Sequence, residues 1–340
     1  MNTSIDHATL TPVKEVTGIT SHTLKKSALT LTEPTVFRGL INDWPIVEKN
    51  KKNSEAAIAY LTSFDNGKDV HTMIGEPEFK GRFFYNDDLT DFNFTREKQP
   101  LNKVLSAIKA QNLSKKKKAY YVGSTSISHI LPGFREENDI PALSDKPMAS
   151  VWIGNQSRIA AHYDIPDNLA CVAVGERRFT LFPSEQLSNL YIGPLDYTPA
   201  GQAASLVDFH HIDSVKYPKF NEALKHAYTV TLKAGDALFI PSMWWHHVEA
   251  MNEINVLVNY WWRDTCNFVG MPTDALYHAM LNIRELPAEQ KNAWRNIFEE
   301  YVFAPKEQTH IPANKRGILN PVDELMARQI KAMLTNKLNY

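Results

Sequence analysis

Short runs rich in Val, Ile, Phe, Tyr and Trp follow one another through the middle of this 340-residue chain, and they constrain its fold most strongly. Each run ends at Gly, Pro, Asn or Asp, the residues that commonly close β-strands. Most of the connections are too short for a helix, so the pattern favours an antiparallel barrel or sandwich. The predicted strands cover residues 119–124, 148–154, 158–164, 169–174, 177–182, 227–232, 236–240, 245–250 and 254–262.

One connection, residues 184–226, is too long for a hairpin loop and is rich in Pro, Gly, His and Asp. Long connections in a compact domain usually carry function. We expect this insertion and residues 74–96 to form the rim of the barrel and to set substrate choice. Their mixture of aromatic and acidic side chains suits a polypeptide and a polar small molecule equally.

Helical patterns flank the β-rich region. Residues 34–45 read as a strand entering a turn, and residues 54–64 and 100–111 place apolar side chains at helical spacing, so the N-terminal third mixes α and β structure. The helical period returns over residues 287–302 and 321–338. The apolar stripes of these two helices suit packing on the barrel and a dimer interface equally.

Composition excludes several functional classes. With 37 basic and 38 acidic residues the net charge is -1, which offers no global field for nucleic acid or an anionic membrane. Cys171 and Cys266 are too few and too far apart for a disulfide framework or a paired-cysteine zinc site. Residues 1–14 lack the apolar segment of a signal peptide, and no stretch is long enough to cross a bilayer, so we expect a cytoplasmic protein. The lysine run at 115–118 reads as a solvated loop, with a basic contact patch as the alternative.

Candidate metal ligands come from two predicted strands. His162 and Asp164 are two residues apart, which places them on one side of a strand. A histidine from the strand 245–250 would complete a 2-His-1-carboxylate triad, which leaves positions of an octahedral iron open. Strand alternation lets either His246 or His247 face inward, and the period does not choose. The alternative is that His162 is an ordinary core histidine and Asp164 caps a turn.

Three stretches of the chain resemble the cupin-like JmjC-domain family, which includes protein asparaginyl hydroxylases. In order they are "AAHYDIPDNLACVAVGERRFTLFP", "VDFHHIDSVKYPKF" and "GDALFIPSMWWHHVEAMNEINVLVNYWW", with a weaker echo in "PTVFRGLINDWP". The resemblance implies a mainly β fold with flanking helices, the double-stranded β-helix of cupin or jelly-roll barrels, with Fe(II) and 2-oxoglutarate. Together with the helical patterns on either side, this divides the chain into an N-terminal α/β elaboration over 1–115, the barrel over 116–270 and a helical segment over 271–340. Similarity to relatives that pair through C-terminal helices implies a homodimer as one role for that last segment.

The resemblance also assigns residues. It implies that the metal ligands are His162, Asp164 and His246, which chooses His246 over His247. Tyr120 competes with Tyr121 for the tyrosine that binds the co-substrate carboxylate. The implied co-substrate contacts are Tyr121, Asn168, Arg177, Asn259 and Trp261.

Two positions depart from the family pattern. Arg177 stands where these hydroxylases usually carry a lysine for the distal carboxylate of 2-oxoglutarate, and arginine can also grip a carboxylate. The alternative for Arg177 is an ion pair on the barrel surface. Ile159 stands where a threonine would donate a hydroxyl to the same carboxylate. We therefore expect altered co-substrate binding near Ile159.

The expected activity is that of an Fe(II)- and 2-oxoglutarate-dependent dioxygenase that hydroxylates a protein or peptide side chain. One alternative is hydroxylation of a free amino acid or small metabolite. Another is a cupin that keeps its metal and acts as a non-catalytic binding module. The complete triad with both asparagines favours an enzyme.

Overall fold

The computed structural model describes residues 2–143, 145, 148–199 and 201–338. The described residues exclude 1, 144, 146, 147, 200, 339 and 340, although some regions predicted from the sequence contain them. The chain divides into two compact units, Met1–Arg263 and Asp264–Tyr340. The first unit contains the predicted β-rich region, and the second contains the predicted C-terminal helices.

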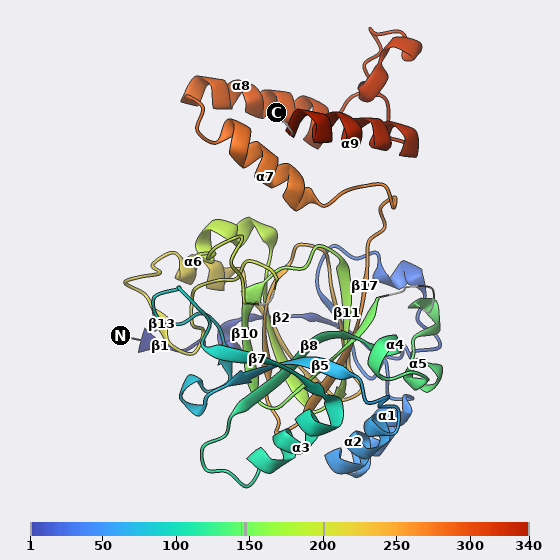
Figure 1. Ribbon diagram of the computed structural model, residues 1–340, viewed down its shortest axis with the longest axis vertical. Helices are drawn as coiled ribbons and strands as arrows, with labels where there is room; N and C mark the ends of the chain where they lie inside the picture. Colours follow the sequence, from blue (N-terminus) through green and yellow to red (C-terminus); the bar gives the residue numbers. More distant parts are fainter. Residues whose placement is uncertain (1, 144, 146–147, 200, 339–340) are drawn as a thin grey trace. The chain divides into compact units, whose positions relative to one another are not determined.

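Two sheets face each other in the first unit and form a cupin, or jelly-roll, barrel with flanking helices (Figure 1), which confirms the predicted fold class. The smaller sheet has the strand order β2-β14-β12-β16-β10-β6, and the larger has the order β3-β4-β15-β11-β17-β9-β8-β5-β7. Strands β1 (Asn2–Thr3) and β13 (Ile212–Asp213) form a separate pair. The smaller sheet comprises β2 (Thr11–Pro12), β6 (Arg82–Phe83), β10 (Ser157–His162), β12 (Glu176–Phe182), β14 (Tyr228–Lys233) and β16 (Trp245–Ala250). The larger comprises β3 (Lys14–Val16), β4 (Thr35–Phe37), β5 (Asp69–Gly75), β7 (Phe94–Pro100), β8 (Ala119–Ser126), β9 (Ala149–Gly154), β11 (Asp167–Val174), β15 (Ala237–Ile240) and β17 (Asn255–Trp262).

The larger sheet is covered on both faces, as strand β11 shows. Every residue from Asn168 to Val174 is buried. Ala170 and Val172 face the apolar cluster inside the barrel, whereas Leu169 and Cys171 join the cluster on the other face. Burial on both faces explains the continuous apolar run, which a strand with one wet face would not have. Each larger side chain buried in this way contributes about 1.5–3 kcal/mol to folding.

The N-terminal helices lie at the end of the barrel opposite α6 (Phe220–Lys225) (Figure 1). Helix α2 (Ser54–Thr62) begins where the Asn53 side chain accepts a 2.7 Å hydrogen bond from the Ala56 amide, which caps the helix. The predicted helical faces are confirmed: α3 (Leu101–Gln111) buries Leu101, Val104, Leu105 and Ile108. Helix α1 (Pro45–Lys52) lies next to α2, and the short helices α4 (Ile127–Ile130) and α5 (Phe134–Glu137) lie beside the larger sheet, where α4 contacts β8 and β9 (Figure 1).

The 184–226 insertion packs on the outer face of the smaller sheet through a buried apolar cluster and a polar layer. The centre of the polar layer is Glu249 of β16, whose carboxylate is hydrogen-bonded by His210 of the insertion. Arg178 Nη1 lies 3.4 Å and His7 Nε2 lies 3.9 Å from the same carboxylate. Burial raises the pKa of Glu249, but the His210 hydrogen bond and neighbouring positive charges outweigh it and hold this pKa at about 2. This layer ties the insertion and the N-terminus to the barrel.

The C-terminal unit buries little of its apolar surface. It consists mainly of α7 (Pro272–Ile283), α8 (Ala288–Phe298) with a π-helical turn at Glu299–Phe303, and α9 (Glu324–Leu338). Among the described residues of this unit, Ala327 is the only hydrophobic one that is buried. The large hydrophobic side chains exposed here are Val269, Met271, Leu276, Tyr277, Leu281, Trp294, Ile297, Tyr301, Val302, Phe303, Ile318, Leu319, Val322, Leu325, Met333, Leu334 and Leu338. In the described part of the chain, no helix combines the length and the apolar character needed to cross a membrane.

Candidate active site

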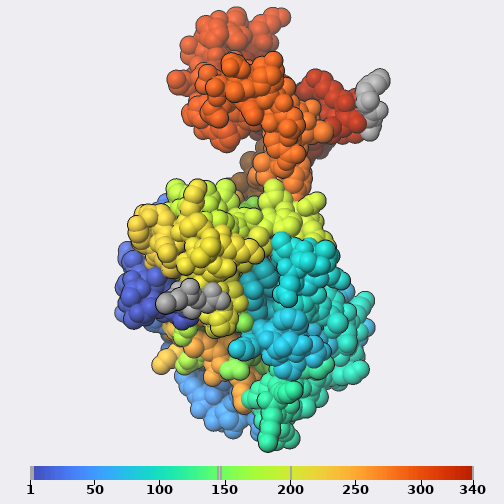
Figure 2. All heavy atoms as spheres, turned by 90° about the vertical axis from the view of Figure 1, so that its left-hand side faces the viewer, coloured from blue at the N-terminus to red at the C-terminus, as the bar shows by residue number. Residues whose placement is uncertain are grey.

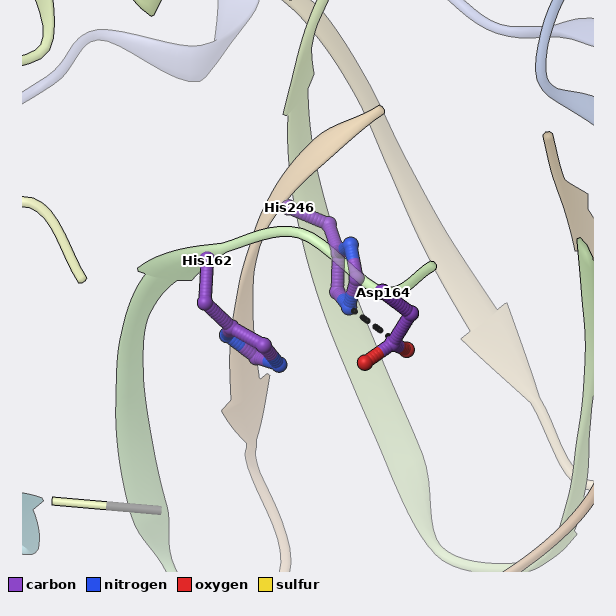
Figure 3. A group of neighbouring side chains, drawn as sticks. All are labelled: His162, Asp164 and His246. Carbon is purple, nitrogen blue, oxygen red and sulfur yellow. Dashed lines mark ion pairs between the residues drawn. The ribbon is translucent and has the colours of Figure 1, made fainter. Parts of the chain in front are cut away.

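His162 at the end of β10, Asp164 just after it and His246 on β16 point toward one another (Figure 3). One possible ligand atom from each lies within 4.8 Å of the other two, and His246 Nε2 is 3.6 Å from Asp164 Oδ2. Within the described ranges this is the only such group of three His, Cys, Asp or Glu side chains. Two imidazoles and one carboxylate form the 2-His-1-carboxylate set that suits Fe(II), so these residues fit a metal of that kind.

A β-bulge brings His162 to this position. His162 pairs with His246 of β16, but the register shifts between Ile159 and His162. Strict alternation would put Ile159 and His162 on opposite faces of β10. The extra residue of a bulge turns both toward the barrel interior, where both line the same cavity.

Asp164 does not lie on the strand as the sequence analysis predicted. Strand β10 ends at His162. Asp164 therefore lies near His162 because of the segment that follows the strand, and not because residues i and i+2 of a strand share a face. The backbone carbonyl of Asp164 accepts a 2.9 Å hydrogen bond from the Met243 amide, in the turn before β16. Met243 has a φ of 67°, a strained value for a non-glycine residue, and it marks a tight turn at this point. The turn holds Asp164 near His246.

Backbone carbonyls orient both imidazoles. His162 Nδ1 lies 2.9 Å from the Ala160 carbonyl oxygen, and His246 Nδ1 lies 3.0 Å from that of Trp244. In each ring the Nδ1–H donates to the carbonyl, which leaves the Nε2 lone pair free for a metal. Burial, together with the nearby His162, lowers the pKa of His246 to about 4. His246 is therefore neutral at pH 7, as metal binding requires.

A chain of hydrogen bonds runs from Asp164 into the barrel. Asn168 Nδ2 donates to Asp164 Oδ2 at 3.3 Å, and Asn259 Nδ2 donates to Asn168 Oδ1 at 3.3 Å. The indole Nε1–H of Trp152 then donates to Asn259 Oδ1 at 2.8 Å. Each amide has one donor and one acceptor engaged, so the chain fixes the orientation of both asparagines. Trp152 is a site residue that the sequence analysis did not identify, because an aromatic side chain on a barrel strand usually belongs to the core.

Arg177 is buried in the same cavity, with 3% of its surface exposed. Its Nη2 donates a 3.4 Å hydrogen bond to the Trp152 carbonyl, and its Nε has no partner. Burial lowers the pKa of Arg177 from its ordinary value. The alternative of a surface ion pair is therefore wrong. The indole nitrogen of Trp261 is also buried without a partner, so two donors await an acceptor in one cavity.

The other predicted co-substrate residues lie on the same walls. Tyr121, Ile159 and Phe179 line the cavity with the metal ligands. Tyr120 packs instead against the core on the other face of the sheet. Burial raises the pKa of Tyr121 above its ordinary value, so its hydroxyl stays protonated and can donate to an anion.

His247 points away from the site. It follows His246 on β16, so alternation sends it to the outer face, where its ring packs 4.4 Å from that of Phe209. Neither ring nitrogen has a hydrogen-bond partner. The structure thus separates the two histidines that the strand period left equivalent.

Comparisons with known proteins agree with this architecture. A family model described as a cupin-like domain matches residues 21–268. The chain is 34% identical over 138 residues to lysine-specific demethylase JMJ31 of Arabidopsis thaliana, covering 39% of this chain and 25% of that protein. It is 24% identical over 256 residues to HSPB1-associated protein 1 of Homo sapiens, covering 70% of this chain and 49% of that protein.

A third relative matches over most of its length. The chain is 25% identical over 311 residues to tRNA wybutosine-synthesizing protein 5 of Gallus gallus, covering 82% of this chain and 91% of that protein. By contrast, the chain spans a quarter of the demethylase and about half of HSPB1-associated protein 1. Because the family model covers most of its length, the chain belongs to the cupin-like, JmjC-type domain family.

Proposed function

We propose that the protein is an Fe(II)- and 2-oxoglutarate-dependent oxygenase. The observation that carries this proposal is Arg177, a buried guanidinium with an unpartnered Nε, in the same cavity as the metal ligands. An unpaired buried charge is costly, so its presence indicates that an anion completes it. A 2-oxo dicarboxylate would bind the metal through its 2-oxo acid end and Arg177 through its distal carboxylate.

The residues of the site would have separate roles in this activity. His162, Asp164 and His246 would hold the metal and leave three of its positions open. Arg177 would anchor the distal carboxylate through charge-assisted hydrogen bonds. The two asparagines and Trp152 would hold Asp164 in one orientation, as outer partners of metal ligands commonly do. The bound Fe(II) would supply the redox chemistry with oxygen.

We propose hydroxylation of a protein or peptide side chain as the reaction. The lysine-specific demethylase among the relatives supports an amino acid as the reacting group. A free amino acid or small metabolite remains the alternative substrate, and a non-catalytic binding module the alternative function. The tRNA named in another relative implies a nucleic-acid substrate there, which a net charge of -1 does not favour here. A cytoplasmic location stays a prediction.

The proposal is tested with the full chain, loaded anaerobically with Fe(II) and 2-oxoglutarate and then exposed to oxygen. We expect succinate to form, even without added substrate, above the level of a His162→Ala control. Calorimetry with Mn(II) in place of iron measures 2-oxoglutarate binding directly. No succinate above the control together with no 2-oxoglutarate binding would exclude the oxygenase.

Arg177→Gln tests the anion site, with Arg178→Gln as the matched control. Arg178 follows on the same strand, but it faces outward to Glu249. We expect Arg177→Gln to weaken 2-oxoglutarate binding roughly 30-fold or more, because it removes one partner of a buried charge pair. Arg178→Gln should leave the affinity unchanged, and an equal loss in both variants would contradict the role given to Arg177.

A further inference from the structure

A second cavity adjoins the one that contains the metal ligands. The two cavities share Tyr121, Ile159 and His162 as walls. A group that occupies the second cavity therefore lies beside the imidazole of a metal ligand. In an oxygenase this is the position from which a substrate C–H bond would face the metal.

The walls of this second cavity are almost entirely apolar. Apart from the three shared residues they are Met73, Phe83, Ala160, Pro199, Gln202 and Ala204. Gln202, from the insertion, carries the only amide side chain, and among the described lining residues there is no Asp, Glu, Lys or Arg. The two cavities thus differ in chemistry: one offers an unpaired guanidinium and two side-chain amides, the other offers hydrocarbon and a single amide.

Two arginines on the rim are already engaged within the chain. The Arg82 guanidinium carbon lies 3.8 Å from the centre of the Phe84 ring, and its Nη1 lies 3.5 Å from Asp208. Arg96 donates a 2.8 Å hydrogen bond to the Pro199 carbonyl. Neither arginine lines the second cavity. The rim therefore does not supply the charge that the cavity lacks.

The insertion and the segment that contains β6 and β7 both contribute walls to this cavity, the first through Pro199, Gln202 and Ala204 and the second through Phe83. Tyr85 Oη donates a 2.5 Å hydrogen bond to the Tyr197 carbonyl, and the rings of Phe92 and Tyr197 stack 4.7 Å apart. Figure 2 shows the face on which the insertion (yellow) and the segment around residues 77–100 (cyan) lie. These contacts join the insertion to the segment whose residue Phe83 lines the cavity.

We propose that the group oxidised is an uncharged aliphatic side chain of the leucine or isoleucine type, which would lie beside the neutral amide of Gln202. The physical reason is desolvation: an ammonium or guanidinium group placed here would lose its water and find no carboxylate among the described walls. A hydrocarbon side chain instead gains from leaving water. This inference rests on the proposed oxygenase function, since it names the substrate class of that same site.

The reaction balances with the reagents already named. The substrate C–H bond and 2-oxoglutarate each give up two electrons, and dioxygen accepts all four. One oxygen atom enters the new C–OH group and the other enters succinate, while the C1 carboxylate leaves as carbon dioxide. The hydrogen of the broken C–H bond ends in the new hydroxyl.

The test compares four probes: the peptides acetyl-Ala-Leu-Ala-amide and acetyl-Ala-Lys-Ala-amide, and free L-leucine and L-lysine. Each is titrated calorimetrically into the full chain with Mn(II) and 2-oxoglutarate in the absence of oxygen, at pH 7. We expect a leucine probe to bind at least about tenfold tighter than its lysine counterpart, because of the desolvation of the lysine ammonium. Binding of the peptide but not of free leucine would identify a polypeptide source, and the reverse would identify a free amino acid.

Gln202→Glu provides a second test, with Gln156→Glu as the control. Both substitutions make the same chemical change, but Gln156 is exposed and lies outside this cavity. We expect Gln202→Glu to improve lysine-probe binding about tenfold by adding a partner for the ammonium, and Gln156→Glu to change nothing. With Fe(II) and oxygen, the bound leucine probe should gain the mass of one oxygen atom.

Two failures are distinguishable. If 2-oxoglutarate does not bind, the proposed function is wrong. If 2-oxoglutarate binds but neither leucine probe does, or the lysine probes bind equally well, the apolar-substrate inference is overturned while the oxygenase proposal stands. A preference for leucine probes that Gln202→Glu does not shift would overturn the role of Gln202.

Discussion

Trp152 is linked to Asp164, a candidate metal ligand, through the amides of Asn259 and Asn168. Trp152→Phe keeps the aromatic wall but removes the N–H that fixes Asn259. Both asparagines could then rotate, and Asp164 would lose its fixed orientation. We expect metal affinity to fall about tenfold, the lower end of the effect of outer partners on metal sites.

The control for this prediction is Trp44→Phe. Trp44 is buried, and its indole donates a 3.0 Å hydrogen bond to the Asp139 carbonyl, away from the site. It should lose stability without losing affinity for Mn(II), as measured by calorimetry. Wild-type affinity in Trp152→Phe would show that the hydrogen-bond chain does not position Asp164.

Ile159 stands where the family pattern has a threonine, so the cavity wall lacks one hydroxyl hydrogen-bond donor at this position. Ile159→Thr restores a hydroxyl to the wall that faces Arg177 and Tyr121. We expect 2-oxoglutarate to bind about tenfold tighter, the approximate contribution of one hydrogen bond to a charged group. Ala170→Ser, which adds a hydroxyl on the larger sheet of the same cavity, is the control for calorimetric titration. Equal affinities in Ile159→Thr and the parent protein would place the carboxylate away from Ile159.

Among the elements, the insertion packs on the barrel through an apolar cluster, and its polar contacts centre on one carboxylate of strand β16, that of Glu249. The pKa of Glu249 is held at about 2 in the folded state, against about 4.5 when unfolded, so the unfolded chain takes up the proton first as pH falls. The stabilisation from Glu249 is complete above about pH 4.5 and is lost as pH falls toward 2. We expect Glu249→Gln to lower the free energy of unfolding at pH 7 by about 1–3 kcal/mol.

Denaturant unfolding at several pH values checks this prediction. The difference between the parent protein and Glu249→Gln should shrink between pH 4.5 and 2, because the parent carboxylate becomes protonated there. Glu253→Gln is the control, since its ion pair with Lys117 is exposed and should contribute little. A difference that does not depend on pH would mean that packing, rather than charge, accounts for the effect.

The strands of the barrel could be predicted from sequence, but their irregularities could not. Each predicted strand between residues 119 and 262 is present, because continuous apolar runs closed by turn residues have few other solutions. Strands β5 and β7 and helix α1 were missed, since β5 and β7 carry polar side chains on exposed faces and α1 is highly charged. Neither the bulge in β10 nor the end of that strand before Asp164 has a local signal, because both depend on pairing with a strand far away in sequence.

Some residues of the candidate site could also be predicted from the sequence, and others could not. The types and spacing of His162 and Asp164, together with the two histidines of a later strand, predicted a candidate metal site without any structure, whereas choosing His246 over His247 required the family resemblance. Trp152 escaped because its role lies in one hydrogen bond to Asn259, and a pattern of residue types does not show hydrogen bonds. Apolar walls such as Ala204 carry no signal of their own either.

At the scale of the whole molecule, the C-terminal unit exposes many large apolar side chains. We propose that the exposed apolar side chains of α7 and α8 pair with a second copy of the chain, because patches of this extent on a soluble surface usually mark an interface. Sedimentation velocity should show a dimer at micromolar concentration. Leu281→Asp combined with Trp294→Asp should give a monomer, whereas Asn296→Asp, an exposed polar position on α8, should not. A monomer of the parent protein would rule out the pairing.

The pairing of the first strands with some of the last has a consequence for synthesis in the cell. Strand β2 pairs with β14 and strand β4 with β15, so these N-terminal strands cannot form those pairs until about 200 further residues have been synthesised. At the usual rates of translation this delay is on the order of 10 to 40 seconds. During that time the earliest strands leave the ribosome with unpaired edges. The larger sheet is complete only once β17 has emerged to pair with β11 and β9, so we expect the growing chain to be most prone to aggregation before the candidate site is assembled.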